Sequence, residues 1–300
     1  MSTIAAEDGF KVAVLIPCHN QAATIAAAVS GFAEALPGAD VYVFDNNSTD
    51  DTARAATRAG ARVYREARQG KANVVRRMFA DIEADIYVLA DGDGTYDPAD
   101  APSLVNALIT ERADMAVGTR SDVAGRPRAA LLERLYRRFT GASFVDVFSG
   151  YRAFTRRFVK SFPAMSTGSE IEAELSVHAG QLMVPVAEID LSYQPRQSTA
   201  PRAAGRGLRG ARTLAMLMKE TRPFAFYTAL AMLFWIAGLA IAVPAWTGPA
   251  GPAGMSMAAV GFFVIGFIVA ACGLVLDSLG RSRVEQKRIL FLTVPALGAQ

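Results

Sequence analysis

The 300-residue sequence has few of the residues that build metal clusters or disulfide frameworks. It contains two cysteines and two histidines, and Cys18 and Cys272 lie far apart in apolar surroundings. None of them has the spacing of a zinc site, and a reduced, intracellular setting suits the cysteines best. The sequence has no Gly-x-Ser-x-Gly motif, and no Gly-x-Gly-x-x-Gly motif stands directly after its first apolar run. These absences argue against a zinc hydrolase, an α/β-hydrolase and a dinucleotide-dependent dehydrogenase.

Charge is also scarce and nearly balanced. Charged residues make up 20% of the chain and hydrophobic residues 52%, and the mean hydropathy is +0.23. The net charge of +3 is too small to indicate binding to nucleic acid, so we expect no such partner. An apolar excess of this size argues against a purely soluble protein.

The apolar residues are concentrated near the C-terminus. From Pro223 to Leu276, a stretch of 54 residues contains no Asp, Glu, Lys, Arg or His. This length allows two crossings of a bilayer at about 20 residues each. The Gly- and Pro-rich segment 247–254 divides the stretch and predicts a turn. We therefore expect a hairpin of two transmembrane helices, at about 224–245 and 255–277.

Basic residues flank this predicted hairpin on both sides, whereas its turn has none. The positive-inside rule then places both ends of the hairpin in the cytoplasm. The preceding segment 207–221 is basic and leucine-containing, and it predicts an interfacial helix on an anionic membrane, an ordinary linker helix being the alternative. The predicted organisation is a domain over 1–200, a basic juxtamembrane helix over 201–222, two membrane helices within 223–279 and a C-terminal tail over 280–300.

The first two-thirds of the chain alternate between predicted strands and helices. The predicted strands are 12–16, 41–44, 61–64, 86–90 and 114–118, and the predicted helices are about 21–36, 50–59, 71–84 and 99–112. This order predicts an α/β fold with a mainly parallel sheet and helices on both faces. Such sheets bind ligands at the carboxyl ends of their strands.

Acidic and polar residues recur directly after these predicted strands. Asp45 ends the second strand, Asp91 and Asp93 follow the fourth, and Arg120 follows the fifth. Two carboxylates separated by one glycine can share a hard cation such as Mg²⁺ or Mn²⁺ and link it to a diphosphate. A simple turn is the alternative, because Asp-Gly pairs are typical of turns.

Several neighbouring polar residues also have a structural explanation. Helix capping accounts for residues 48–51 but not for Asp45, whose carboxylate could accept hydrogen bonds from a base or a ribose. Gly70 and Lys71 lack the rest of a P-loop, although Lys71 at a helix N-terminus could contact a phosphate or remain solvated. His19 follows the first strand without a second histidine nearby, so a structural role is expected for it.

The ordered set of these motifs resembles a known enzyme family. The segments that carry the resemblance are 14–20 (Val-Leu-Ile-Pro-Cys-His-Asn), 45–52 (Asp-Asn-Asn-Ser-Thr-Asp-Asp-Thr), Gly70-Lys71 and Asp91-Gly-Asp93. Together they resemble the Rossmann-like GT-A fold of family 2 inverting glycosyltransferases. Residues 146–152 (Asp-Val-Phe-Ser-Gly-Tyr-Arg) and 170–175 (Glu-Ile-Glu-Ala-Glu-Leu) are similar to the polyprenyl-phosphate branch, which includes dolichol-phosphate mannosyltransferase and bactoprenol glucosyltransferases. The resemblance covers roughly residues 11–220.

The resemblance implies roles for individual residues. It makes Asp91, Asp93 and Arg120 catalytic, with Asp91 and Asp93 as ligands of Mg²⁺ or Mn²⁺. The residues implied to bind the nucleotide sugar are Pro17, Asn20, Asp45, Asn47, Lys71 and Asp91. Those implied to bind the acceptor and its phosphate are Arg120, Arg126, Arg128, Ser149, Tyr151, Arg152 and Arg202. Glu170 and Glu172 would belong to a helix beneath the site.

The implied activity is inverting transfer of a hexose from a UDP- or GDP-linked sugar to polyprenyl (undecaprenyl) phosphate. The enzyme would be a multi-pass protein of a bacterial inner membrane with its catalytic domain in the cytoplasm, and we also consider a homo-oligomer. The segment 124–138 lacks the asparagines expected there, which leaves the sugar and the acceptor open. The alternatives are another lipid acceptor, such as a diacylglycerol, and an inactive membrane-anchored protein that binds nucleotide sugars. A processive synthase is disfavoured, because both tryptophans lie in the predicted membrane segment and none can complete a Gln-x-x-Arg-Trp motif.

Overall fold

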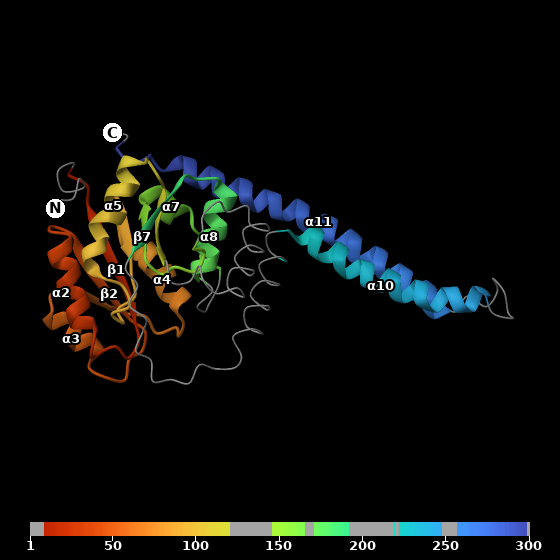
Figure 1. Ribbon diagram of the computed structural model, residues 1–300, viewed down its shortest axis with the longest axis horizontal. Helices are drawn as coiled ribbons and strands as arrows, with labels where there is room; N and C mark the ends of the chain where they lie inside the picture. Colours follow the sequence, from red (N-terminus) through yellow and green to blue (C-terminus); the bar gives the residue numbers. More distant parts are fainter. Residues whose placement is uncertain are drawn as a thin grey trace. The chain divides into compact units, whose positions relative to one another are not determined.

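A computed structural model describes residues 9–120, 146–165, 171–191, 219, 222–247 and 257–298. The chain divides into two compact units, residues 1–203 with 287–300, and residues 204–286. The first unit is an α/β domain, and the second contains two long apolar helices (Figure 1). Apart from Lys219 and Arg222, the predicted juxtamembrane helix lies outside the described residues.

The α/β domain is built on a seven-stranded sheet with the order β3-β2-β1-β4-β6-β5-β7. The strands are β1 (Val12–Cys18), β2 (Asp40–Asp45), β3 (Arg62–Arg65), β4 (Ile86–Leu89), β5 (Met115–Arg120), β6 (Arg152–Thr155) and β7 (Val186–Leu191). Among these, β6 alone runs antiparallel to its neighbours. The prediction of a mainly parallel α/β sheet is confirmed.

Helices cover both faces of this sheet. One face carries α2 (Ile25–Ala35), α3 (Thr52–Arg58), the short 3₁₀ helix η1 (Pro98–Asp100) and α5 (Ala101–Thr110), and the other carries α4 (Lys71–Asp81), α7 (Arg156–Ser161) and α8 (Ile171–Leu182) (Figure 1). All seven residues of β1 are therefore buried, as expected for a parallel strand with helices on either side.

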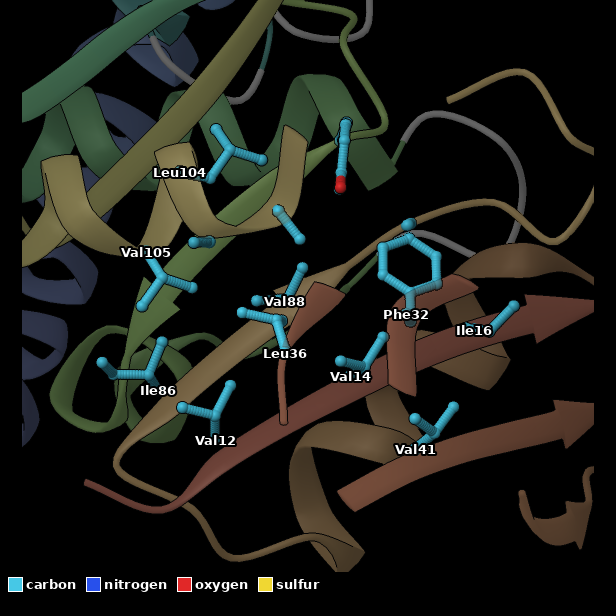
Figure 2. Close-up of a cluster of buried hydrophobic side chains, with 14 of the residues drawn as sticks. Val12, Val14, Ile16, Phe32, Leu36, Val41, Ile86, Val88, Leu104 and Val105 are labelled. Carbon is cyan, nitrogen blue, oxygen red and sulfur yellow. The ribbon is translucent and has the colours of Figure 1, made fainter. Parts of the chain in front are cut away.

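The larger core lies between the sheet and helices α2 and α5. Val12, Val14 and Ile16 alternate along β1 and point to the same side, where Phe32 of α2 and Leu104 of α5 pack against them (Figure 2). This core holds the strand ends in place, so the loops that follow the strands start from fixed positions.

The topology creates a switch point between β1 and β4. From β1 the chain proceeds outward through β2 and β3 and then returns to β4 on the opposite side of β1. Strands β1, β2, β4 and β5 all point the same way, so their carboxyl ends share one edge. Ligands of open α/β sheets bind at such a point.

The second unit contains α10 (Pro223–Thr247) and the first part of α11 (Met257–Thr293). Both helices are long and apolar enough to cross a membrane, and only 17% of the most apolar window of each is buried, unlike the core helix of a soluble domain. Their exposed residues include Leu233, Ile236, Phe267 and Ile268. The two helices indicate membrane association of this part of the chain.

The predicted end of the second helix at 277 is wrong, since α11 continues to Thr293. The segment after Asp277 contains mostly helix-forming residues and no proline before Pro295, and Arg281 pairs with Asp277 one turn earlier at 2.8 Å. The end of the chain is not a separate tail either. Lys287 Nζ donates to Gln181 Oε1 at 2.9 Å, and the Arg157 guanidinium lies 4.6 Å from the ring centre of Phe291. Residues 287–300 therefore belong to the α/β unit.

Small residues allow α10 and α11 to pack closely. Ala259, Gly266 and Gly273 recur every seventh residue along α11 and are buried. A Cβ atom at position 273 would lie 2.8 Å from Tyr227 Cβ, and one at position 266 would overlap the Trp235 indole. Close approach of this kind stabilises pairs of membrane helices through van der Waals contact.

Replacing Gly266 by leucine should therefore separate the two helices. We expect a lower melting temperature and a lower yield of folded protein in detergent, because the added side chain would occupy the volume of the Trp235 indole. Gly261→Leu is the matched control, since nothing lies within 4 Å of a Cβ atom at position 261. Equal melting temperatures for the two variants would contradict this packing.

His178 of α8 makes the stability of the α/β domain sensitive to pH. Its ring is buried between Phe158 and Phe162 and shares a hydrogen bond of 3.0 Å with Ser161 Oγ. Burial, and then the positive charge of Lys287, lower the pKa of His178 to about 3. The unfolded chain binds this proton more readily, so stability should fall as the pH drops below about 6.5.

The expected loss is at most about 1.4 kcal/mol per pH unit below about pH 6.5, from this one group. Thermal melting between pH 7.5 and 5.5 measures it, and His178→Gln should flatten the dependence. An unchanged slope in that variant would show that other groups control the acid sensitivity.

Candidate functional site

A buried charge cluster lies at the carboxyl edge of the sheet. Lys71 Nζ lies 2.6 Å from Asp91 Oδ1 and 2.6 Å from Glu172 Oε1. Lys71 begins α4, Asp91 follows β4, and Glu172 lies in the first turn of α8. The three side chains are 20%, 28% and 12% exposed, so a ligand can reach them although they are largely removed from water.

The cluster carries one more negative charge than positive charge. Burial raises the pKa of Asp91, and the Lys71 ammonium opposes this effect, whereas Glu172 and Asp93 add to it. Burial alone would lower the pKa of Lys71, but the two carboxylates raise it overall, so Lys71 remains charged. A site with a net negative charge attracts cations and hydrogen-bond donors.

Asp93 lies beside this cluster on a turn that only glycine permits. A Cβ atom at position 92 would lie 2.7 Å from Gln21 Oε1 and 2.8 Å from Ile25 Cδ1, so the turn packs directly against the start of α2. Asp93 Oδ1 accepts the Thr95 N–H at 3.1 Å, and its side chain is partly exposed. The predicted pair Asp91 and Asp93 therefore does lie at one site.

Among the described residues, no group of three or more His, Cys, Asp or Glu side chains could hold a metal ion. The donor set at this edge is the carboxylates of Asp93 and Asp91, and one oxygen of Asp91 is engaged by Lys71. Two carboxylates suit a hard cation that takes its remaining oxygen ligands from a diphosphate or from water. The residues present thus fit a divalent cation that binds together with a phosphorylated ligand.

Asp45 offers an acceptor on the other side of the switch point. It ends β2, is 6% exposed, and accepts the Ser48 N–H through Oδ2 at 3.3 Å. Its Oδ1 is buried and has no hydrogen-bond partner in the part of the chain that the structure describes. A buried acceptor without a partner is costly, so it is suited to a ligand N–H or O–H donor.

Pro17, Asn20 and Asn47 lie at the ends of β1 and β2, at the same edge of the sheet as Asp45. Pro17 is buried in β1, one position before Cys18, which pairs in register with Asp45. Asn20 and Asn47 both have positive φ angles, 53° and 58°, and Asn20 Oδ1 accepts the Thr49 N–H at 2.8 Å. Their side chains mainly shape the loops.

Burial, followed by the negative charge of Asp45, raises the pKa of the Cys18 thiol to about 12, so this thiol stays protonated and is no nucleophile.

Asn46 is a site residue that the sequence analysis missed. Its Nδ2 donates to the carbonyls of Glu66 and Arg68 at 2.9 and 2.8 Å, and its Oδ1 accepts the Gly70 N–H at 2.8 Å. These bonds fix the loop that ends at Lys71. A polar residue directly after a buried strand was the available signal, but nothing in the sequence shows that it folds back onto a loop some twenty residues later.

The loop over residues 146–151 closes the opposite side of the cluster. Ser149, Tyr151 and Arg152, which the resemblance places on the acceptor side, are all completely buried. The Arg152 guanidinium donates to the carbonyl oxygens of Ser149 at 2.8 Å and Val147 at 2.7 Å. The structure thus gives Arg152 a different place, because a buried guanidinium bound to carbonyls holds the loop and does not reach a lipid phosphate.

Tyr96, a second residue that the sequence analysis missed, joins this loop to the Asp91 turn. Its hydroxyl oxygen accepts the Gly150 N–H at 2.9 Å, and its ring lies 5.1 Å from that of Tyr151. Tyr151 in turn donates its hydroxyl proton to the Asp97 carbonyl at 3.2 Å. The loop and the turn are therefore tied together by two hydrogen bonds and a ring contact.

The other predicted residues are only partly placed. Arg120 is the last residue of β5, at the same edge of the sheet as Asp45 and Asp91. The predicted contacts Arg126, Arg128, Glu170 and Arg202 lie outside the described residues.

Replacing Arg152 by alanine should lower the free energy of unfolding by about 3–5 kcal/mol, because it leaves a large cavity in a fully buried place and removes the donor of the buried Ser149 carbonyl, although Ser176 still donates to the Val147 carbonyl. Arg152→Lys is the matched variant, and it should recover only part of the loss, since one ammonium cannot reproduce the planar fork. Chemical denaturation measures both variants. A loss below about 1 kcal/mol in Arg152→Ala would show that the loop does not depend on this side chain.

Comparison with known proteins agrees with this geometry. The sequence profile of "Glycosyl transferase family 2" matches residues 13–161. Protein RfbJ of Shigella flexneri is 51% identical over 113 residues, 38% of this chain and 88% of its own. Glycosyltransferase AglJ of Haloferax volcanii is 35% identical over 196 residues, 62% of this chain and 63% of its own. An undecaprenyl-phosphate mannosyltransferase of Micrococcus luteus is 24% identical over 216 residues, 65% and 88% of the two chains.

Solved structures show the same fold. Glucosyl-3-phosphoglycerate synthase of Mycobacterium tuberculosis is 26% identical in one crystal structure, with a TM-score of 0.60 over 72% of this chain and 82% of that one. Another structure of it, in complex with Mg²⁺ and UDP, has a TM-score of 0.62 at 24% identity, over 72% and 80% of the two chains. The chain belongs to glycosyltransferase family 2 and has the GT-A fold. It is a glycosyltransferase.

Proposed function

We propose that this enzyme transfers a hexose, with inversion, from a UDP- or GDP-linked sugar to a polyprenyl phosphate such as undecaprenyl phosphate. The observation that carries the proposal is the combination in one chain of a family 2 site and two helices long and apolar enough to span a membrane. The mannosyltransferase of Micrococcus luteus, named for the same lipid phosphate, supports this acceptor. The reaction would take place at the cytoplasmic face of a bacterial inner membrane.

In this proposal, the nucleotide sugar lies across the switch point between β1 and β4. Asp45 Oδ1, which lacks a partner among the residues described, accepts a hydrogen bond from the base or the ribose. Lys71, at the N-terminus of α4, and the nearby turn of Asp91 and Asp93 flank the diphosphate and the sugar. The two sides of the donor pocket come from loops that the β1–β2 and β1–β4 pairs bring together.

Asp93 is the principal residue to hold Mg²⁺ or Mn²⁺, assisted by Asp91. The bound cation supplies positive charge that stabilises the departing diphosphate. Lys71 keeps the Asp91 carboxylate ionised and oriented, and the turn fixed by Gly92 keeps Asp93 beside it.

The acceptor phosphate is already anionic at neutral pH and requires no base. One of its oxygens bonds to the anomeric carbon while the bond from that carbon to the diphosphate oxygen breaks, so a nucleoside diphosphate leaves. Two anions must approach each other, and cationic side chains lower the cost of this encounter. We assign that role to Arg120 at the end of β5, together with Arg126, Arg128 and Arg202 in the segments that follow β5 and β7.

Transfer assays in detergent test this proposal. The purified protein is given radiolabelled UDP- and GDP-sugars with Mg²⁺ or Mn²⁺, and undecaprenyl phosphate, diacylglycerol or no lipid. We expect an acid-labile, lipid-soluble product with undecaprenyl phosphate alone. Product formed only with diacylglycerol would support the alternative acceptor. Binding of nucleotide without product from any donor would support a binding protein without catalysis.

A further inference from the structure

We infer that Gly150 is a specificity-determining residue, whose missing side chain leaves room for a neutral sugar hydroxyl beside Asp91. The inference rests on the proposed function, because it assumes that the donor sugar lies at the Lys71–Asp91–Glu172 cluster.

The two oxygens of Asp91 have different surroundings. Oδ1 is 2.6 Å from Lys71 Nζ, whereas Oδ2 has neither a hydrogen bond nor an ion pair to any part of the chain that is described. Asp91 is 28% exposed, and a carboxylate oxygen has two lone pairs, so Oδ2 can accept a hydroxyl beside a cation that Asp93 mainly holds. A charged acceptor in a largely dry site binds a hydroxyl donor more strongly than a neutral acceptor does.

Gly150 borders this open oxygen. A Cβ atom at position 150 would lie 3.1 Å from Asp91 Oδ2, 3.2 Å from Tyr96 Oη and 3.5 Å from Lys71 Nζ. The φ angle of Gly150 is not positive, so the backbone itself would accept another residue there. The crowded polar atoms, and not the backbone conformation, therefore favour glycine at this position, because a Cβ atom would fit only if these side-chain ends moved by a few tenths of an ångström.

The loop that carries Gly150 has little freedom to retreat. Tyr96 holds the Gly150 N–H, and the buried Arg152 guanidinium holds the carbonyls of Val147 and Ser149. Ser176 Oγ of α8 also donates to the Val147 carbonyl at 2.9 Å. An added methyl group would thus displace the Asp91 carboxylate or fill the space beside Oδ2.

The charge of the cluster adds a second selectivity. A sugar carboxylate placed against Oδ2 would be repelled by the Asp91 and Glu172 carboxylates directly beside it, whereas a neutral hexose would donate hydroxyl protons to Oδ2. The ligand class is therefore a neutral hexosyl group and not a hexuronic acid.

Calorimetric binding to the full-length protein in detergent with Mn²⁺ tests this inference. The probes are UDP, UDP-glucose, UDP-glucuronic acid, GDP and GDP-mannose, and the readout is the ratio of the Kd for each nucleotide sugar to that for its nucleoside diphosphate. For wild type, we expect the ratio for UDP-glucuronic acid to be the least favourable of the three. Gly150→Ala should worsen the ratio for the preferred neutral sugar by about tenfold or more, the loss expected for a hydrogen bond to a charged group, while the nucleoside diphosphate binds within about twofold of wild type.

Gly261→Ala is the matched control, because it makes the same chemical change where nothing lies within 4 Å, and its ratios should equal those of wild type. An unchanged ratio in Gly150→Ala, or tight binding of UDP-glucuronic acid to wild type, would overturn the inference and leave the proposed function intact. A wild-type protein that binds neither nucleoside diphosphate would overturn both. If Gly150→Ala does not fold, Asp91→Asn is measured in the same way. A wild-type ratio of the Kd for the neutral nucleotide sugar to that for its nucleoside diphosphate in this variant would overturn the inference.

Discussion

Asp93→Ala is expected to lower kcat/KM for sugar transfer by about a thousandfold, which corresponds to about 4 kcal/mol of transition-state stabilisation. The reason is electrostatic. Of the paired carboxylates Asp91 and Asp93, Asp93 is the one that Lys71 does not engage, so we expect it to be the main protein ligand for a cation on the departing diphosphate. Initial rates with the accepted donor and undecaprenyl phosphate measure the loss.

Two controls separate this role from folding. Asp97 lies on the same turn, and its Oδ1 accepts the Ala99 N–H at 2.9 Å, so Asp97→Asn keeps an acceptor there and should retain activity within about twofold. Excess EDTA should reduce wild type to about the rate of Asp93→Ala. A variant that still responds to added Mn²⁺ with a wild-type rate would exclude Asp93 as the metal ligand.

Lys71→Met should lower kcat/KM by on the order of a hundredfold, because two largely buried carboxylates would then face each other without a counter-charge. The pH profile should change as well. In the wild-type protein, burial raises the pKa of Asp91 and the Lys71 ammonium opposes this rise, so removal of Lys71 should raise the pKa of Asp91 further. Activity that requires ionised Asp91 is lost as the pH falls through its pKa, so the acid limb should move to higher pH.

A second substitution tests the physical reason. In Lys71→Met with Glu172→Gln, one unpaired negative charge is gone, so the melting temperature and the acid limb should both move back towards wild type. The rate of sugar transfer should stay low, because the double variant still lacks the Lys71 ammonium beside the diphosphate. An additive loss of stability in the double variant would mean that Lys71 and Glu172 do not interact.

The sequence predicts much of the domain that carries this site. Helices and strands up to residue 120 match the predicted ones closely, because their apolar periodicity and their flanking Gly, Pro and Asp residues are local signals. The long uncharged stretch after Pro223 likewise predicts two membrane-length helices. The end of α11 at Thr293 was missed, because charged residues after Asp277 suggest the end of a membrane span but do not stop a helix.

Within the site, sequence reasoning identified which residue types follow which strand, but not what each side chain contacts. The family resemblance implied that Arg152 binds the acceptor and its phosphate, but this residue is completely buried against carbonyl groups. Asn46 and Tyr96 gave no strong signal, and both join loops that are distant in sequence.

By itself, then, the sequence determined the α/β architecture, the edge of the sheet where the acidic residues gather, and the two apolar helices. Only the tertiary structure decided that Lys71 pairs with both Asp91 and Glu172, that Gly150 lies against the open oxygen of Asp91, and that the chain returns to the α/β domain after Lys287. The physical reason is the distance along the chain over which each kind of interaction acts. Periodicity and turn chemistry act over a few neighbouring residues, whereas charge pairing and close packing depend on which distant segments the fold brings together.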